Sequence, residues 1–350
     1  MIKARISLLM STLLTAFGTL CAQTTSFAFA GDIMMGTTFP DDSKGIYLPK
    51  NDGRNLFDDV RLITRSVDVA AGNLEGVFME PGGKAKKCSD PSVCYVFRMP
   101  PSYVANLTDA GFDFMSVANN HVNDFGAQGM KSTYATLSGA DLASAGLTGI
   151  NESAIIERAG KKIGFAAFSP SAGTLNMLDI NSAKRIISNL DSICDLVVVS
   201  FHGGAEGPKV SHVPHAMEEA FGYKRGNVEA FARAAVDAGA DIVYGHGPHV
   251  VRAMEIYNGH IIMYSLGNFC TPYRVNLAGI CGYAPLVTVD IDDTGKFVKG
   301  QIHPFIQQRG QGPLKDDTGK VINQIRNLSI SDFPATYPHI EDNGVILPRN

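Results

Sequence analysis

Five groups of polar side chains each follow a short apolar run of the sequence, and their residue types bind metal ions or transfer protons. The groups are Asp32, Asn73 with Glu75, Asn119 to His121, His202, and His246 with His249. Four of the nine histidines fall within them. Imidazole combined with carboxylate and amide oxygen suits zinc, manganese or iron, whereas magnesium and calcium sites usually lack several histidines. The groups therefore predict a site for a first-row divalent ion.

Each group, taken alone, also has a structural interpretation. An aspartate at a strand end, such as Asp32, often caps a helix or turn, and Asn73 and Glu75 are compatible with turns. His202 precedes two glycines, where a histidine hydrogen-bonded within its loop is the alternative. The pair His246 and His249 in a Gly/Pro loop favours metal binding more strongly. Five such groups after five apolar runs favour one shared site over coincidence.

Strand-like and helical stretches alternate along the chain and position these groups. In open α/β sheets the carboxyl ends of the strands form the binding crevice, so the five groups are expected to converge there. The alternation predicts an α/β layered domain. The predicted strands are 27–30, 67–71, 112–117, 163–168, 196–201, 241–244 and 261–266, and the predicted helices are 101–110, 129–139, 226–238 and 321–328.

The composition is that of a folded globular protein. Of the 350 residues, 45% are apolar and 18% charged, which excludes a disordered or fibrous chain. The formal net charge is −4 and no basic run exceeds residues 84–87, so no nucleic-acid partner is expected. We expect one domain over 23–350, with a core of about 27–290 and a peripheral C-terminal extension, 291–350.

Residues 1–22 are predicted to be a secretory signal peptide. Lys3 and Arg5 precede an apolar run, 6–14, that is too short to span a bilayer, and cleavage is expected after Ala22. A second small-residue cleavage site at 16–18, an uncleaved anchor and a lipid-anchored cysteine at position 21 are the alternatives. The expected location is periplasmic, extracellular or associated with the cell envelope.

Export permits disulfides, and five cysteines remain beyond the signal peptide. Cys88 and Cys94 flank a turn-like loop that a disulfide would close, and Cys270 and Cys281 bracket another loop. Cys194 precedes an apolar run and is expected to be a buried thiol. No CxxC motif occurs, so a thiolate metal site is not expected.

Six ordered motifs between about Phe27 and Phe269 resemble the CapA-type family. That family is linked to poly-γ-glutamate capsule biosynthesis and is similar to the calcineurin-like metallophosphoesterases. The resemblance implies a four-layer α-β-β-α sandwich that holds two metals at strand ends. The motifs are Gly31-Asp-Ile-Met-Met-Gly36, Asn73-Leu-Glu-Gly76, Ala118-Asn-Asn-His-Val-Asn-Asp-Phe-Gly126, His202-Gly-Gly-Ala-Glu206, Gly239-Ala-Asp-Ile-Val-Tyr-Gly-His-Gly-Pro-His-Val250 and Tyr264-Ser-Leu-Gly-Asn-Phe269.

The resemblance also implies a ligand set and a proton donor. The expected metal ligands are Asp32, Glu75, Asn120, His202, His246 and His249, with Glu75 bridging both ions. His121 would act as general acid or transition-state donor, and Asp124 would orient it. Glu206 is an acidic candidate for substrate binding at the rim. Arg98 is a candidate anion contact, with a solvated surface arginine as the alternative.

One departure from the phosphoesterase pattern bears on activity. Met34 stands where that pattern carries a histidine, so the first metal would be short of a ligand. We expect an exported metal-dependent hydrolase with one or two divalent ions (Mn, Zn or Fe), acting on a phosphoester or γ-glutamyl amide of an anionic envelope or capsule polymer. Other capsule-assembly proteins are expected as further partners. The alternative, which Met34 supports, is a non-catalytic polymer-binding or capsule-assembly protein.

Overall fold

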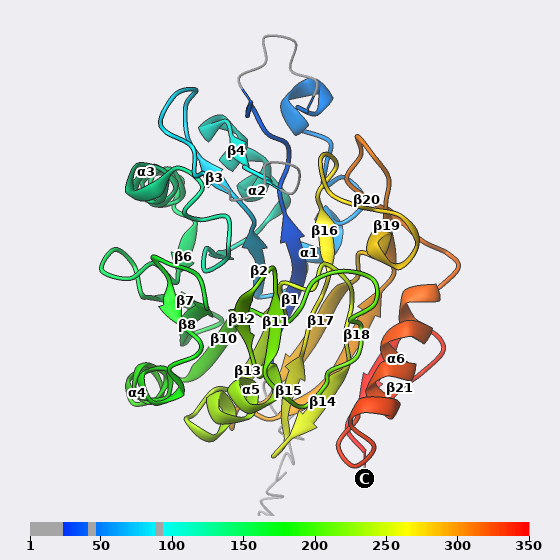
Figure 1. The fold of residues 1–350 in the computed structure, drawn as a ribbon. Helices are drawn as coiled ribbons and strands as arrows, with labels where there is room; N and C mark the ends of the chain where they lie inside the picture. The colour runs from blue at the N-terminus through cyan, green and yellow to red at the C-terminus, as the bar shows by residue number, and fades with distance from the viewer. Residues whose placement is uncertain (1–23, 41–46, 88–93, 350) are drawn as a thin grey trace, which may run out of the picture.

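Two β-sheets pack face to face, and helices cover their outer surfaces (Figure 1). The computed structural model describes residues 24–40, 47–87 and 94–349. The four-layer α-β-β-α sandwich expected from the sequence is confirmed. The predicted signal peptide lies outside the described residues. Within the described ranges, no helix is long and apolar enough to cross a bilayer.

The nine-stranded sheet is built around β1 (Thr25–Ile33), which pairs in parallel with β2 on one side and antiparallel with β17 on the other. Strand β16 (Asn268–Cys270) also pairs with the end of β1. The order across the sheet is β21 (His339–Ile340), β22 (Val345–Leu347), β18 (Phe297–His303), β17 (Leu286–Ile291), β1, β2 (Val69–Leu74), β5 (Phe114–Ser116) and β6 (Ala143–Ala145).

The seven-stranded sheet centres on β10 (Leu196–His202), whose seven residues are all buried. A strand covered on both faces carries a nearly continuous apolar run, which explains the sequence Leu-Val-Val-Val-Ser-Phe. The order across the sheet is β14 (Met254–Tyr257), β15 (His260–Met263), β13 (Ile242–His246), β10, β8 (Lys161–Ser169) and β7 (Ser153–Arg158), with β9 (Leu175–Asn176) paired to β8.

Aromatic contacts join the two sheets at the centre of the molecule. The rings of Phe29 and Tyr244 lie 4.7 Å apart, and those of Phe114 and Phe165 lie 4.2 Å apart. Helices α1 (Arg61–Thr64), α2 (Val104–Ala110) and α3 (Gly126–Gly139) pack on the outer face of the nine-stranded sheet. Helices α4 (Ile180–Asp191) and α5 (Val228–Asp237) cover the seven-stranded sheet, and α6 (Lys320–Asp332) packs on β14 and β21.

Short elements complete the described chain. They are the helical turns η1 (Lys50–Gly53), η3 (Pro101–Tyr103) and η4 (Gly279–Gly282), and the paired strands β3 (Val77–Phe78) with β4 (Arg98–Met99), β11 (Glu218–Ala220) with β12 (Tyr223–Gly226), and β19 (Phe305–Gln307) with β20 (Pro313–Lys315).

The segment from residue 291 onward is an integral part of the sandwich rather than a peripheral one. Strands β18 and β22 extend the nine-stranded sheet beyond β17, and α6 lies against its edge. Ile302, Ile325 and Ile346 are buried in the core between the sheets. The segment from residue 291 onward therefore contributes strands and side chains to the core.

The cysteines divide into free and bonded ones. Cys270 and Cys281 are free and buried, so the loop that they bracket is not closed by a disulfide. Cys194 is a free thiol, partly buried against the helices of the seven-stranded sheet. Cys94 is disulfide-bonded, whereas Cys88, its expected partner, lies outside the described residues.

Candidate metal centre

The polar residues at the carboxyl ends of the parallel strands β1, β2, β10 and β13 lie close together. Asp32 is in register with Asn73 across β1 and β2, and His202 is in register with His246 across β10 and β13. Strands from both sheets meet there, since Asp32 Oδ1 lies 3.2 Å from His246 Nδ1. Close backbone approach makes this convergence possible: a Cβ on Gly31 would lie 2.1 Å from the Gly267 carbonyl oxygen.

Asp32 is fully buried at the centre of the cluster. Its Oδ2 is 2.9 Å from His249 Nδ1, and its Oδ1 accepts a hydrogen bond from Asn73 Nδ2. Burial alone would raise the pKa of Asp32, but His246 and His249 hold it well below its usual value. Burial lowers the pKa of His249, but the neighbouring Asp32 carboxylate raises it more, to about 10. The two residues therefore form an ion pair in which Asp32 is fully buried and His249 is partly exposed.

Glu75 lies beside this pair, just after β2. Its Oε2 accepts a hydrogen bond of 2.7 Å from Asn73 Nδ2 and is 3.5 Å from His202 Nδ1. Burial, reinforced by the Asp32 carboxylate, raises the pKa of Glu75 to about 8. One donor atom from each of Asp32, Glu75 and His202 lies within 4.8 Å of the others. These three side chains are close enough to share a single cation.

Several buried polar atoms in this cluster have no hydrogen-bond partner among the described residues. A buried polar group without a partner costs free energy, and native structures contain few of them. Burial and the charge of Arg225 lower the pKa of His202 well below its ordinary value, so its imidazole is neutral, as a metal ligand must be. The donor set therefore fits a first-row divalent ion. The atoms are both ring nitrogens of His202 and of His246, Glu75 Oε1, Asn120 Oδ1 and Asn268 Oδ1.

His121 stands next to the cluster with one ring nitrogen fixed. Its Nδ1 is 2.9 Å from Asp124 Oδ2, while its Nε2 lies 3.9 Å from Glu75 Oε1. Lys86 Nζ is 2.6 Å from the other oxygen of Asp124, and the Phe97 ring packs 4.3 Å from the imidazole. Burial lowers the pKa of His121, opposed by Asp124. The geometry leaves Nε2 available to a reacting group.

Of the two predicted substrate contacts, Glu206 lies at the cavity and Arg98 does not. Glu206 lines the cavity beside the cluster and pairs with Arg225 at 3.0 Å. Arg98 is 1% exposed, so a solvated surface arginine is the wrong interpretation. Its guanidinium donates to the carbonyl oxygen of Gly82 and to Thr38, and it lies over the Phe125 ring. Arg98 is thus not brought to the cavity.

Three asparagines that were not among the predicted metal ligands hold those ligands in position. Asn73 Nδ2 bonds both Asp32 and Glu75, and Asn119 Nδ2 bonds Asn73 Oδ1 at 3.1 Å. Asn268 Nδ2 donates to the His249 carbonyl oxygen. All three follow predicted strands, and this position after a strand is the signal in the sequence that marked them. The sequence did not show which carboxylates and imidazoles they contact.

A cavity of about 260 Å³ opens beside these ligands. Its walls include Glu75, His121 and His249, together with the aromatic rings of Phe97 and Phe221. A cavity of this kind, with a few converging polar groups, is the expected form of a small-molecule site.

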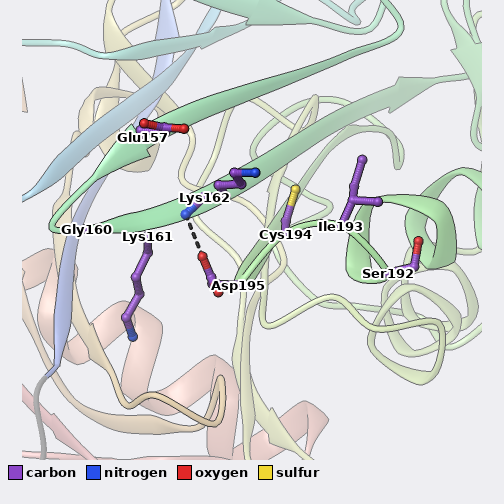
Figure 2. Close-up of a pocket in the computed structure, with 8 residues that line it drawn as sticks. All are labelled: Glu157, Gly160, Lys161, Lys162, Ser192, Ile193, Cys194 and Asp195. Atoms are coloured by element: carbon purple, nitrogen blue, oxygen red, sulfur yellow. Dashed lines mark hydrogen bonds between the residues drawn. The ribbon is translucent and has the colours of Figure 1, made fainter.

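A larger hollow, of about 540 Å³, lies by the start of β8 and β10, at the opposite ends of these strands (Figure 2). Its lining residues are all described and contain no histidine. Asp195 accepts a hydrogen bond from the Lys162 backbone, and burial raises the pKa of Cys194, which keeps that thiol protonated. None of the predicted site residues lines this larger hollow.

The two packed sheets, with candidate ligands at the ends of their strands, form a metallophosphoesterase-like fold. A crystal structure of a phosphatase from Mycoplasma pneumoniae has the same fold, with a TM-score of 0.53 and 16% identity over 82% of this chain and 95% of that one. The chain belongs to the bacterial capsule synthesis protein PGA_cap family, whose model matches residues 26–273.

Two relatives extend the match along the chain. The PGA biosynthesis protein CapA of Bacillus subtilis is 31% identical over 336 residues, covering 87% of this chain and 77% of its own length. A probable polyglutamine synthesis accessory protein of Mycobacterium tuberculosis is 29% identical, covering 75% of this chain and 73% of its own. Family membership and the CapA-type resemblance are confirmed.

Metal binding at neutral pH is expected to release a proton from Glu75. With a pKa of about 8, this carboxyl is protonated at neutral pH in the metal-free protein, and a cation must displace that proton. Affinity should therefore rise with pH and level off, for this proton, above about pH 8. Titration calorimetry in buffers of different ionisation enthalpy counts the protons released.

The Glu75→Gln variant should release one proton fewer than the wild type. Glu157→Gln, an exposed carboxylate by the opposite hollow, is the matched control and should behave as the wild type. Equal proton release by the wild type and Glu75→Gln would contradict the assignment of Glu75 as the protonated ligand.

Proposed function

We propose that this protein is a metal-dependent hydrolase that cleaves a phosphoester or a γ-glutamyl amide in an anionic envelope or capsule polymer. The observation that carries the proposal is the cluster of buried atoms without a hydrogen-bond partner among the described residues, which includes the His202 ring nitrogens, His246 Nε2 and Glu75 Oε1, next to the oriented imidazole of His121. A cluster built only for stability would pair these atoms. The names of the relatives, which refer to PGA and capsule biosynthesis, support the polymer class.

The residues present divide the work between binding and proton transfer. Asp32, Glu75, Asn120, His202, His246 and His249 would hold one or two divalent ions. Such ions lower the pKa of water and polarise a phosphoryl or carbonyl oxygen. Asp124 keeps a proton on His121 Nδ1 and stabilises the imidazolium form, whose Nε2–H can then be donated to the leaving group. The aromatic rings of Phe97 and Phe221 form part of the wall of the cavity beside them.

The test combines elemental analysis with turnover. Metal content of the purified protein is measured, and hydrolysis of bis-p-nitrophenyl phosphate and of a γ-linked glutamate oligomer is followed with and without a chelator. We expect one or two bound first-row ions per chain, with turnover lost on chelation and restored by manganese or zinc. Protein that is fully loaded with metal but hydrolyses neither substrate would refute the proposal.

The second candidate is a non-catalytic polymer-binding protein that retains the fold. Met34, fully buried directly after β1, stands at a usual ligand position and favours this alternative. Thioether sulfur is a poor ligand for a hard or borderline ion. Retention of the polymer in a pull-down, with no release of phosphate or amine, is the result that this alternative predicts.

The cellular setting follows from the same proposal. We propose that the chain is exported and works in the periplasm, outside the cell or at its envelope, where capsule polymer and other capsule-assembly proteins are its partners. The basic and apolar character of residues 1–22 and the capsule-related names of the relatives support this setting. Detection of a mature N-terminus at Gln23 in an extracellular or envelope fraction tests it.

A further inference from the structure

A second hollow, of about 550 Å³, lies next to the candidate metal cavity. The two hollows have four lining residues in common, Tyr95, Arg274, Val275 and Asn276. A chain that extends out of the metal cavity past these side chains would reach the second hollow. An extended substrate has room there for the groups next to the cleaved bond.

The charge of the lining changes along this path. The metal cavity is lined by the carboxyl groups of Glu75 and Glu206. Among the described residues that line the second hollow there are two arginines, Arg274 and Arg309, and no acidic side chain. Arg274 lines both hollows, and the lining becomes more basic from the metal cavity to the second hollow.

Arg274 is held in place by aromatic rings. Its guanidinium carbon lies 5.1 Å from the centre of the Tyr47 ring and 5.9 Å from that of Tyr95. Stacking of this kind holds a guanidinium and leaves its planar N–H groups free for a carboxylate or phosphate. The Arg274 backbone has φ of +59°, a conformation that costs a non-glycine residue free energy and that clusters at functional sites.

We infer that Arg274, stacked on Tyr47 and Tyr95 in a hollow that Arg309 also lines, forms a subsite for a negatively charged group of the polymer next to the bond at the metal centre. The ligand is a carboxylate or a phosphate on a repeating chain, which a planar guanidinium binds through paired hydrogen bonds. The inference rests on the proposed function for what occupies the metal cavity. It adds that the substrate carries a charge beyond the reacting group.

Binding, rather than turnover, tests the subsite. A short γ-linked glutamate oligomer and a short linear polyphosphate are titrated into the metal-loaded protein by calorimetry at two salt concentrations. Arg274→Ala is expected to weaken binding of the preferred oligomer about tenfold and to reduce its salt dependence. Arg274→Lys, which keeps the charge and loses the planar donors, should fall between. The oligomer that responds identifies the anion as carboxylate or phosphate.

Arg185→Ala is the matched control, because Arg185 is an exposed arginine on α4, on the outer face of the seven-stranded sheet. It should bind as the wild type does. A wild type that binds neither oligomer, or an Arg274→Ala variant that binds both with unchanged affinity, overturns the subsite. A wild type that binds an oligomer through Arg274 but hydrolyses nothing refutes the proposed function and leaves the subsite standing.

Discussion

Replacing His121 with alanine is expected to lower turnover by about 10²- to 10⁴-fold, the usual contribution of a positioned proton donor. The side chain is 6% exposed, and its Nδ1 is already engaged by Asp124, so Nε2 is the atom offered to the leaving group. His121 lies 3.9 Å from Glu75 but is not counted among the metal ligands, so metal content should stay near that of the wild type. Single-turnover rates and elemental analysis on the same preparation measure both.

Two further variants, His212→Ala and Asp124→Asn, distinguish an effect on catalysis from a general loss of stability. His212→Ala removes an imidazole that is 66% exposed and paired with Asp332, away from the cavity, and should leave turnover unchanged. Asp124→Asn keeps the shape but removes the charge that stabilises the His121 imidazolium, so it should lower turnover and shift the pH profile. Wild-type turnover by a metal-loaded His121→Ala variant would contradict the assigned role.

Asp32→Asn is expected to lower metal affinity by about a hundredfold or more. Loss of groups that only support metal ligands already costs 10- to 100-fold, and Asp32 contacts both His246 and His249 directly. The substitution keeps size and shape, so a loss reflects the carboxylate charge. Competition of a fluorescent chelator with each protein for zinc or manganese measures the affinity.

The same variant should be less stable than the wild type without metal. Removing one partner of a buried ion pair costs about 3–5 kcal/mol. The folded-state pKa of His249 is raised to about 10, so the stability that it contributes is fully present below its unfolded value near 6.5 and is lost as pH rises through 10. The difference in free energy of unfolding should therefore be large near pH 6 and small near pH 10.

Urea unfolding of chelator-treated protein at these two pH values tests the effect. Asp317→Asn, whose carboxylate is 87% exposed, is the control and should change the free energy of unfolding little at either pH. A pH-independent difference between Asp32→Asn and the wild type would show that the ion pair is not its cause.

The sequence predicted the ends of the strands more reliably than the helices and the order of strands in the sheets. The strands that carry Asp32, His202 and His246 were predicted because each combines a buried apolar run with a following polar group. Helix α4 was missed, although Asp179 caps it and Ala183, Ile187 and Leu190 are buried at helical spacing. The residues of that helix themselves carry the signals that predict it, so it was predictable from the sequence. The order of strands in the sheets was not, because it depends on pairings between distant segments.

The candidate site shows the same limit. Residue type and spacing predicted the ligand cluster, which the buried contacts of Asp32 with His246 and His249 bring together. Arg98 was misjudged because its burial depends on Gly82 and Thr38, which only the folded chain places beside it. A single sequence carries no measure of such contacts.

The position of β1 also sets when the centre can form during synthesis. This strand lies between β2 and β17, so one neighbour comes from residues 69–74 and the other from residues 286–291. A nascent chain that has just passed His202 holds Asp32 and Glu75 but lacks both β13 and the strand that covers the other edge of β1. The pairings that hold these ligands in register are then still incomplete. Most of the polypeptide must therefore be present before the ligands can take up the distances seen in the folded protein.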